Sequence, residues 1–147
     1  MATWYTINAQ PPRSADAGLV QALVLLWANM DLFEDFRARY PFALDDFQVE
    51  ACRAIEKGHG VIVSAPTGAG KTLVAEFAIH LALASGKRIA YTTPLKALSN
   101  QKFADFVRLY GAETVGILTG DVKVNPRGRV LVMTTEILRN IDRKSVV

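Results

Sequence analysis

The sequence Val61-Ile62-Val63-Ser64 leads directly into Ala65-Pro66-Thr67-Gly68-Ala69-Gly70-Lys71-Thr72, and a helical pattern begins at Leu73. An apolar strand, a glycine-containing loop and a helix in this order are typical of a phosphate-binding loop. The backbone N–H groups of such a loop point inward and end at a helix N-terminus with partial positive charge, so phosphate oxygens fit there. This stretch therefore predicts a site for a nucleoside triphosphate.

The residues of this loop have separate expected roles. Gly68 and Gly70 allow backbone angles and a close approach that a Cβ would obstruct. Lys71 can reach the β and γ phosphates, and the Thr72 hydroxyl can ligate Mg²⁺. We therefore predict Lys71 and Thr72 as catalytic residues and Thr72 as the metal ligand. The predicted nucleotide-binding residues of the loop are Ala65, Pro66, Thr67, Gly68, Ala69, Gly70, Lys71 and Thr72.

The composition is that of one globular domain. At 147 residues, with 50% of them hydrophobic, the chain can form a single core. Cys52 is the single cysteine, which allows neither an internal disulfide nor a zinc cluster and predicts a reducing, cytoplasmic location. The apolar run from Leu19 to Ala28 is too short to span a bilayer. We expect it to form a buried helix rather than a signal peptide, and we expect no membrane contact.

Charge is distributed unevenly along the chain. Residues 1–85 hold 6 Lys and Arg against 9 Asp and Glu, whereas residues 86–147 hold 11 against 5. Contact with a phosphate backbone requires such a basic half, although surface charges of this kind often face only solvent. Charge alone leaves these two interpretations equally open.

Strand and helix patterns alternate along the rest of the chain. We expect strands at residues 60–64, 88–92, 114–118 and 130–133, with helices between them. This alternation predicts an α/β fold with a parallel, doubly wound sheet of about four strands, flanked by helices and incomplete. Ligands of such a sheet bind at the carboxyl ends of its strands. Residues 1–40 are expected to form an N-terminal helical segment of unknown role.

Polar and small residues mark the expected ends of the helices. Asp46 is expected to cap the helix before the phosphate loop. Thr93 and Pro94 are expected to begin a helix that Gly111 closes. Thr134 is expected to cap a short last helix. These positions place several hydroxyl groups at helix N-termini.

Four other segments resemble motifs of DExH-box helicases. The string Phe42-Ala43-Leu44-Asp45-Asp46-Phe47-Gln48 resembles their adenine-recognising motif. Gln48 is then placed to read the adenine edge, because its amide both donates and accepts hydrogen bonds, and Phe42 to stack on the base. Three later segments resemble motifs that contact nucleic acid in the same proteins, namely YTTPLKALSNQK at 91–102, LTGD at 118–121 and VMTTEILR at 132–139.

Together with the loop, these motifs are similar to those of superfamily 2 DExH-box RNA helicases, in the superkiller and exosome-helicase branch and most closely its actinobacterial members. Ala65 stands where the general loop pattern has glycine, a variant common among helicases. The resemblance covers about residues 32–141. It implies the first RecA-like domain of a P-loop NTPase, truncated, at residues 41–141. It also implies ATP and Mg²⁺ as cofactors and ATP-dependent RNA unwinding by the complete protein.

The resemblance further implies a grip on one strand of nucleic acid. Such helicases hold phosphates through backbone N–H groups, helix N-termini and hydroxyls. RNA as the partner rests on the resemblance alone, because nothing in these residues tests for a 2′-hydroxyl. Thr93 and Thr134 have the alternative role of ordinary helix caps. The predicted nucleic-acid-binding residues are Pro94, Leu95, Lys96, Gln101, Thr119, Gly120, Asp121, Thr134, Thr135 and Glu136.

The family pattern is not complete in this sequence. An Asp-Glu-x-His motif and a second RecA-like domain with its arginines are expected of the family and do not occur in the 147 residues. We therefore expect this polypeptide by itself to bind nucleotide weakly and to hydrolyse it negligibly. Residues 142–147 are expected to be a non-native tail. The alternatives are a noncatalytic nucleotide- or RNA-binding stub and a fragment of a DNA helicase.

Overall fold

The structure, a computed structural model, describes residues 4–7 and 31–145 of the chain. It divides into two compact units. Residues 10–84 form the helical unit, and residues 1–9 together with 85–147 form the sheet unit. The predicted apolar helix at 19–28 lies outside the described residues.

The described helices of the helical unit pack around a small apolar core. They are α2 (Leu32–Arg37), α3 (Asp46–Glu56) and α4 (Lys71–Ala84). Burial of aromatic and aliphatic side chains from all of them stabilises the unit. The buried core consists of Phe33, Phe36, Ala51, Cys52, Leu73, Val74 and Phe77.

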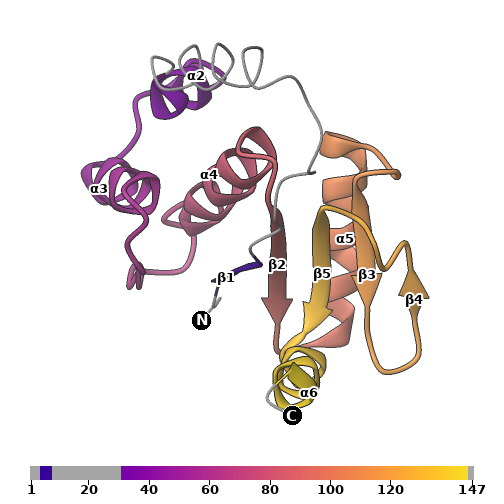
Figure 1. The fold of residues 1–147 in the computed structure, drawn as a ribbon. Coiled ribbons are helices and arrows are strands. Elements are labelled where there is room, and N and C mark those ends of the chain that lie inside the picture. The colour runs from indigo at the N-terminus through magenta and orange to yellow at the C-terminus, as the bar shows by residue number, and fades with distance from the viewer. Residues whose placement is uncertain (1–3, 8–30, 146–147) are drawn as a thin grey trace. The chain divides into compact units, whose positions relative to one another are not determined.

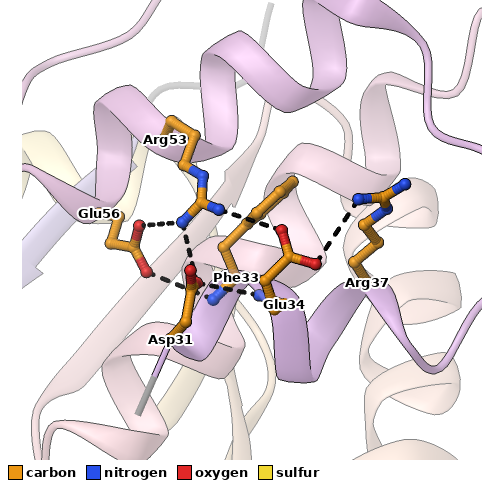
Figure 2. A network of polar contacts seen from close by, with 6 residues as sticks. All are labelled: Asp31, Phe33, Glu34, Arg37, Arg53 and Glu56. Carbon is orange, nitrogen blue, oxygen red and sulfur yellow. Dashed lines mark hydrogen bonds and ion pairs between the residues drawn. The ribbon is translucent and has the colours of Figure 1, made fainter. Parts of the chain in front are cut away.

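One guanidinium group joins α2 to α3. Figure 2 shows Arg53 among three carboxylates, with nitrogens 2.8 Å from Asp31, 3.1 Å from Glu34 and 3.0 Å from Glu56. The guanidinium also lies over the Phe33 ring, 4.3 Å from its centroid. The hydrogen bond from Arg53 holds the pKa of Asp31 below its usual range. Because solvent reaches these charges, the network orients the two helices more than it stabilises them.

The strand expected at residues 60–64 is not formed. Val61 and Val63 pack against the core of the helical unit, whereas the Ile62 side chain is 81% exposed. Alternating burial of this kind is typical of extended backbone. A strand also needs a neighbouring strand to pair its backbone N–H and C=O groups. The described part of the helical unit offers only helices and loops, so the prediction of a strand is wrong.

The sheet unit contains a five-stranded sheet in the order β1-β2-β5-β3-β4. Its central strands β2 (Arg88–Thr93), β5 (Val130–Thr134) and β3 (Val115–Leu118) are parallel, as predicted. The edge strands β1 (Trp4–Ile7) and β4 (Lys123–Val124) pair antiparallel, so the sheet is mixed rather than purely parallel. Trp4–Ile7 is therefore a strand in a segment that was expected to be helical.

Helices cover the central strands. In Figure 1, α5 (Lys96–Tyr110) lies along β5 and β3, and α6 (Thr135–Ser145) follows β5 without a break. The Phe106 ring of α5 packs edge-on against Tyr91 of β2, with centroids 5.0 Å apart. Residues of the three central strands are almost all buried, as expected of parallel strands covered by helices. The predicted α/β architecture is confirmed.

The predicted helix ends are confirmed at one position and wrong at three. Gly111 closes α5 with φ of 85°, which favours glycine. Thr93 belongs to β2, where it pairs with Thr134, so it cannot cap a helix and α5 starts only after Leu95. Asp45, rather than Asp46, is the N-cap of α3. The last helix was expected to be short, but it runs over 11 residues to Ser145.

Candidate nucleotide and nucleic-acid sites

The phosphate loop has the backbone that its sequence predicts. Gly68 and Gly70 adopt φ of 86° and 76°, a region that L side chains rarely enter. The Ala69 N–H donates to the Pro66 carbonyl oxygen at 3.2 Å, which forms a turn ahead of the helix. Lys71 then begins α4, a helix of 14 residues. The loop therefore ends at a helix N-terminus, where an anion is favoured.

Lys71 and Thr72 both lie exposed in the first turn of α4. The Lys71 ammonium donates a hydrogen bond to the Ala65 carbonyl oxygen and thereby spans the loop from its last residues to its first. Thr72 places a hydroxyl group at the same helix end. The cation and the hydroxyl group thus lie at the same end of α4.

An open pocket of about 480 Å³ lies beside the loop. Gly68, Ala69 and Gly70 form one side of it. Phe42 and Gln48, the predicted adenine-binding residues, also line it. The helical unit therefore brings both predicted base-binding residues and three of the eight predicted loop residues into one pocket. The loop residues that do not line it are Ala65, Pro66, Thr67, Lys71 and Thr72.

Gln48 connects α3 to the phosphate loop. It is 5% exposed, and its Oε1 accepts from the Asp45 N–H at 3.0 Å while its Nε2 donates to the Gly70 carbonyl oxygen at 3.1 Å. A Cβ at Gly70 would stand only 2.5 Å from that Nε2. The amide keeps one N–H and one lone pair, which is enough for a pair of hydrogen bonds to a base edge.

Five of the residues that line the pocket were not predicted as nucleotide-binding from the sequence, namely Tyr40, Ala43, Asp45, Leu73 and Glu76. Tyr40 and Glu76 lie outside every motif and contact each other. The Tyr40 hydroxyl donates to Oε2 of Glu76 at 2.8 Å, and both residues line the pocket. No motif marks them, because Tyr40 precedes the adenine-like string and Glu76 lies on α4 beyond the loop. The sequence feature that could have indicated Glu76 is its position about one turn into the helix that follows the phosphate loop.

The predicted nucleic-acid-binding residues gather at the carboxyl ends of the three parallel strands, which we call the sheet edge. Thr93 pairs with Thr134, and Leu118 pairs with Met133, so β2, β5 and β3 end side by side. Figure 1 shows α6 following β5 at this edge. Gln101 is exposed in the second turn of α5. The residues placed directly after the three strand ends are Pro94, Leu95, Lys96, Thr119, Gly120, Asp121, Thr135 and Glu136.

Side-chain contacts join the three strand ends. Asp121 forms an ion pair with Lys96 and accepts from the Thr119 hydroxyl at 2.9 Å. These two partners, Lys96 first, hold the pKa of Asp121 below its usual range. The Thr135 hydroxyl donates to the Thr93 carbonyl oxygen at 3.3 Å. The edge therefore offers hydroxyls and exposed backbone, but the charge of Lys96 already has a carboxylate beside it.

A profile of the DEAD/DEAH box helicase family matches residues 45–146. The chain belongs to this family. It is 63% identical over 106 residues to the "probable helicase HelY" of Mycobacterium tuberculosis, a match that covers 72% of this chain and 12% of that protein. It is 52% identical over 107 residues to the "DExH-box ATP-dependent RNA helicase DExH15 chloroplastic" of Arabidopsis thaliana, covering 73% and 9%.

A third relative is the "antiviral helicase SKI2" of Saccharomyces cerevisiae, 51% identical over 102 residues, with 69% of this chain and 8% of that protein covered. The chain thus spans about a tenth of the length of these curated relatives. The resemblance to DExH-box helicases that the sequence motifs indicated is confirmed.

Two other observations concern metal binding and membrane spans in this DEAD/DEAH box chain. Within residues 31–145, His, Cys, Asp and Glu side chains do not gather in threes as a metal-binding group. None of the helices that the structure describes is long and apolar enough to cross a membrane.

Proposed function

We propose that this chain is the ATP-binding and nucleic-acid-binding part of an ATP-dependent RNA helicase of the cytoplasm. The observation that carries the proposal is the pocket in which Phe42, Gln48 and the glycines of the phosphate loop meet. A nucleotide site needs aromatic or polar side chains that contact the base and backbone N–H groups that bind the phosphates. The helical unit supplies both within one depression.

In this proposal, the phosphates of ATP lie on residues 65–72 and the adenine lies against Phe42 and Gln48. The residues fit, because Gly68 and Gly70 carry no Cβ atom at the two loop positions with positive φ, and Lys71 supplies a cation at the helix N-terminus. Mg²⁺, held by Thr72, would neutralise charge on the phosphates. Gln48 couples the two ends of the pocket through its hydrogen bond to Gly70.

Single-stranded RNA would lie along the sheet edge formed by residues 94–96, 119–121 and 134–136, with Gln101 beside it. Hydroxyls and backbone at strand ends suit phosphates and carry no sequence information. RNA is preferred over DNA because the Arabidopsis thaliana relative described above is named an RNA helicase. DNA binding of equal strength is the outcome that would correct this choice.

We further propose that the 147 residues alone turn over ATP negligibly. Among the described residues, His, Cys, Asp and Glu side chains do not gather in threes as a metal-binding group, and no arginine lines the pocket. Charge that develops on the γ-phosphoryl group then lacks a stabilising cation besides Lys71. We place the ATP-binding domain at residues 41–141.

The test is titration of the purified chain with ATP and with a fluorescent single-stranded RNA. Lys71→Ala should weaken ATP binding at least tenfold, since the loop loses its cation, and should leave RNA binding unchanged. Lys96→Ala combined with Thr135→Ala should weaken RNA binding and leave ATP binding unchanged. A chain that binds neither ligand, or in which Lys71→Ala has no effect on ATP, contradicts the proposal.

A further inference from the structure

A row of aromatic rings leads from the core of the helical unit to the mouth of the nucleotide pocket. The centroids of Phe77 and Phe36 are 5.3 Å apart, those of Phe36 and Tyr40 also 5.3 Å, and those of Tyr40 and Phe42 5.4 Å. Phe77 and Phe36 are buried, whereas Phe42 is 56% exposed. The exposed Phe42 ring thus packs against Tyr40, which in turn packs against the buried ring of Phe36.

Tyr40 is fixed from two directions. Its ring packs on Phe36, and its hydroxyl donates to Glu76 on α4 at 2.8 Å. The helix that carries Glu76 is the helix that begins at the phosphate loop. The hydrogen bond therefore ties the segment that holds Phe42 to the element that receives the phosphates.

We propose that Tyr40 and Glu76 are positioning residues that hold Phe42 in place to stack on the base of a bound nucleotide. This inference rests on the proposed function of the pocket. An exposed aromatic side chain loses rotamer freedom when it stacks on a ligand, and this loss weakens binding. Tyr40 and Glu76 restrict Phe42 before the nucleotide arrives, so less entropy is lost on binding.

The positioning role has a specific signature. Phe42 can contact a base but has no part in holding phosphates at the loop, since its aromatic face offers no hydrogen-bond donor. Loss of the Tyr40–Glu76 hydrogen bond should therefore weaken binding of ATP and spare binding of inorganic tripolyphosphate. A purely structural role would weaken both ligands together with the stability of the unit.

The experiment is calorimetric titration of the 147-residue chain with ATP and with inorganic tripolyphosphate. Tyr40→Phe and Glu76→Ala each remove the hydrogen bond, and each should raise the Kd for ATP about fivefold, with the Kd for tripolyphosphate unchanged. Glu76→Gln is the matched control, because the amide oxygen still accepts from the tyrosine and ATP affinity should stay within about twofold of the parent. Melting temperatures confirm that each variant is folded.

A double variant separates positioning from direct contact. Phe42→Leu should itself weaken ATP binding, and in that background Tyr40→Phe should have no further effect, because its action passes through the Phe42 ring. A fivefold loss that persists without Phe42, equal losses for both ligands, or parental ATP affinity in Tyr40→Phe and Glu76→Ala would each overturn the inference. A parent chain that binds tripolyphosphate as tightly as ATP overturns it as well, while one that binds neither ligand overturns the proposed function and this inference together.

Discussion

The proposed nucleotide pocket and the sheet edge are built from different kinds of contact. In the pocket, a buried amide and two glycines with positive φ set the geometry, and Gln48 is 5% exposed. At the edge, strand register places the residues, and the Lys96–Asp121 ion pair has side chains that are 50% and 57% exposed. Buried, sterically fixed contacts tolerate change poorly, whereas exposed ion pairs contribute little. We therefore expect substitutions in the pocket to reduce stability and binding strongly. Substitutions at the sheet edge should have small effects as long as the sheet itself is intact.

The largest loss of stability is expected from a substitution within the sheet that carries the edge residues. A Cβ at Gly116 in β3 would lie 2.0 Å from the backbone oxygen of Asn125, so Gly116→Ala forces backbone to move. We expect a loss of about 3 kcal/mol in the free energy of unfolding. Gly120→Ala is the matched control, since nothing lies within 4 Å of a Cβ there. Equal urea midpoints for the two variants would show that the sheet adapts more readily than the contacts indicate.

A second pair of variants tests the pocket. Gly68→Ala and Gly70→Ala both place a side chain at positive φ, at a cost of about 1 kcal/mol each. Gly70→Ala should lose about 1 kcal/mol more and most of its ATP affinity, because it displaces the Gln48 amide. Urea unfolding and ATP titration measure the difference. If the two variants behave alike, Gln48 does not hold the loop.

The sequence predicted the parts of both sites that local patterns determine. The glycines of the phosphate loop, the strands β2, β3 and β5, and the closing Gly111 follow from spacing and backbone preference. The edge strands β1 and β4 could not be predicted, because two to four residues carry too little pattern and form a strand by pairing. The segment at 60–64 shows the converse, since a strand pattern without a partner stays an extended loop.

Side-chain contacts between distant segments account for most of the rest. The Tyr40–Glu76 hydrogen bond and the Lys96–Asp121 ion pair join residues 36 and 25 positions apart. The local periodicity of a sequence does not predict contacts between residues that far apart in the chain. The gathering of residues 94–96, 119–121 and 134–136 was predictable, because parallel strands end at the same edge.

A pH dependence is expected in the helical unit. Burial, and then the positive charge of Arg39, lower the pKa of His80 against the opposing attraction of Asp35, whose Oδ2 lies 3.4 Å from Nε2. The unfolded chain therefore binds this proton more readily than the folded one, and stability is full above about pH 6.5 and falls as the pH drops below it. His80→Gln should flatten this part of the curve.

The measurement is urea unfolding of parent and variant between pH 7.5 and pH 5. His59→Gln serves as the control, since it makes the same substitution at an exposed histidine. Identical curves for the parent and His80→Gln would contradict the assignment of this dependence to His80.

The smallest effect is expected at the sheet edge. Asp121→Asn removes the carboxylate that neutralises Lys96, so RNA affinity should rise about twofold to threefold at low salt. Lys96→Ala should lower RNA affinity and reduce the salt dependence by about one counterion. Fluorescence anisotropy at several salt concentrations measures both. Weaker RNA binding by Asp121→Asn would show that the carboxylate itself contacts the nucleic acid.

The central claim is that one pocket of the helical unit seats the base of a nucleotide beside the phosphate loop. Photolabelling of the chain with 8-azido-ATP, followed by mass spectrometry of the labelled peptides, tests it most directly. The account predicts a label within residues 40–48 that both ATP and inorganic tripolyphosphate suppress, because all three ligands share the loop. A label confined to residues 88–145, or one that neither competitor suppresses, would contradict it.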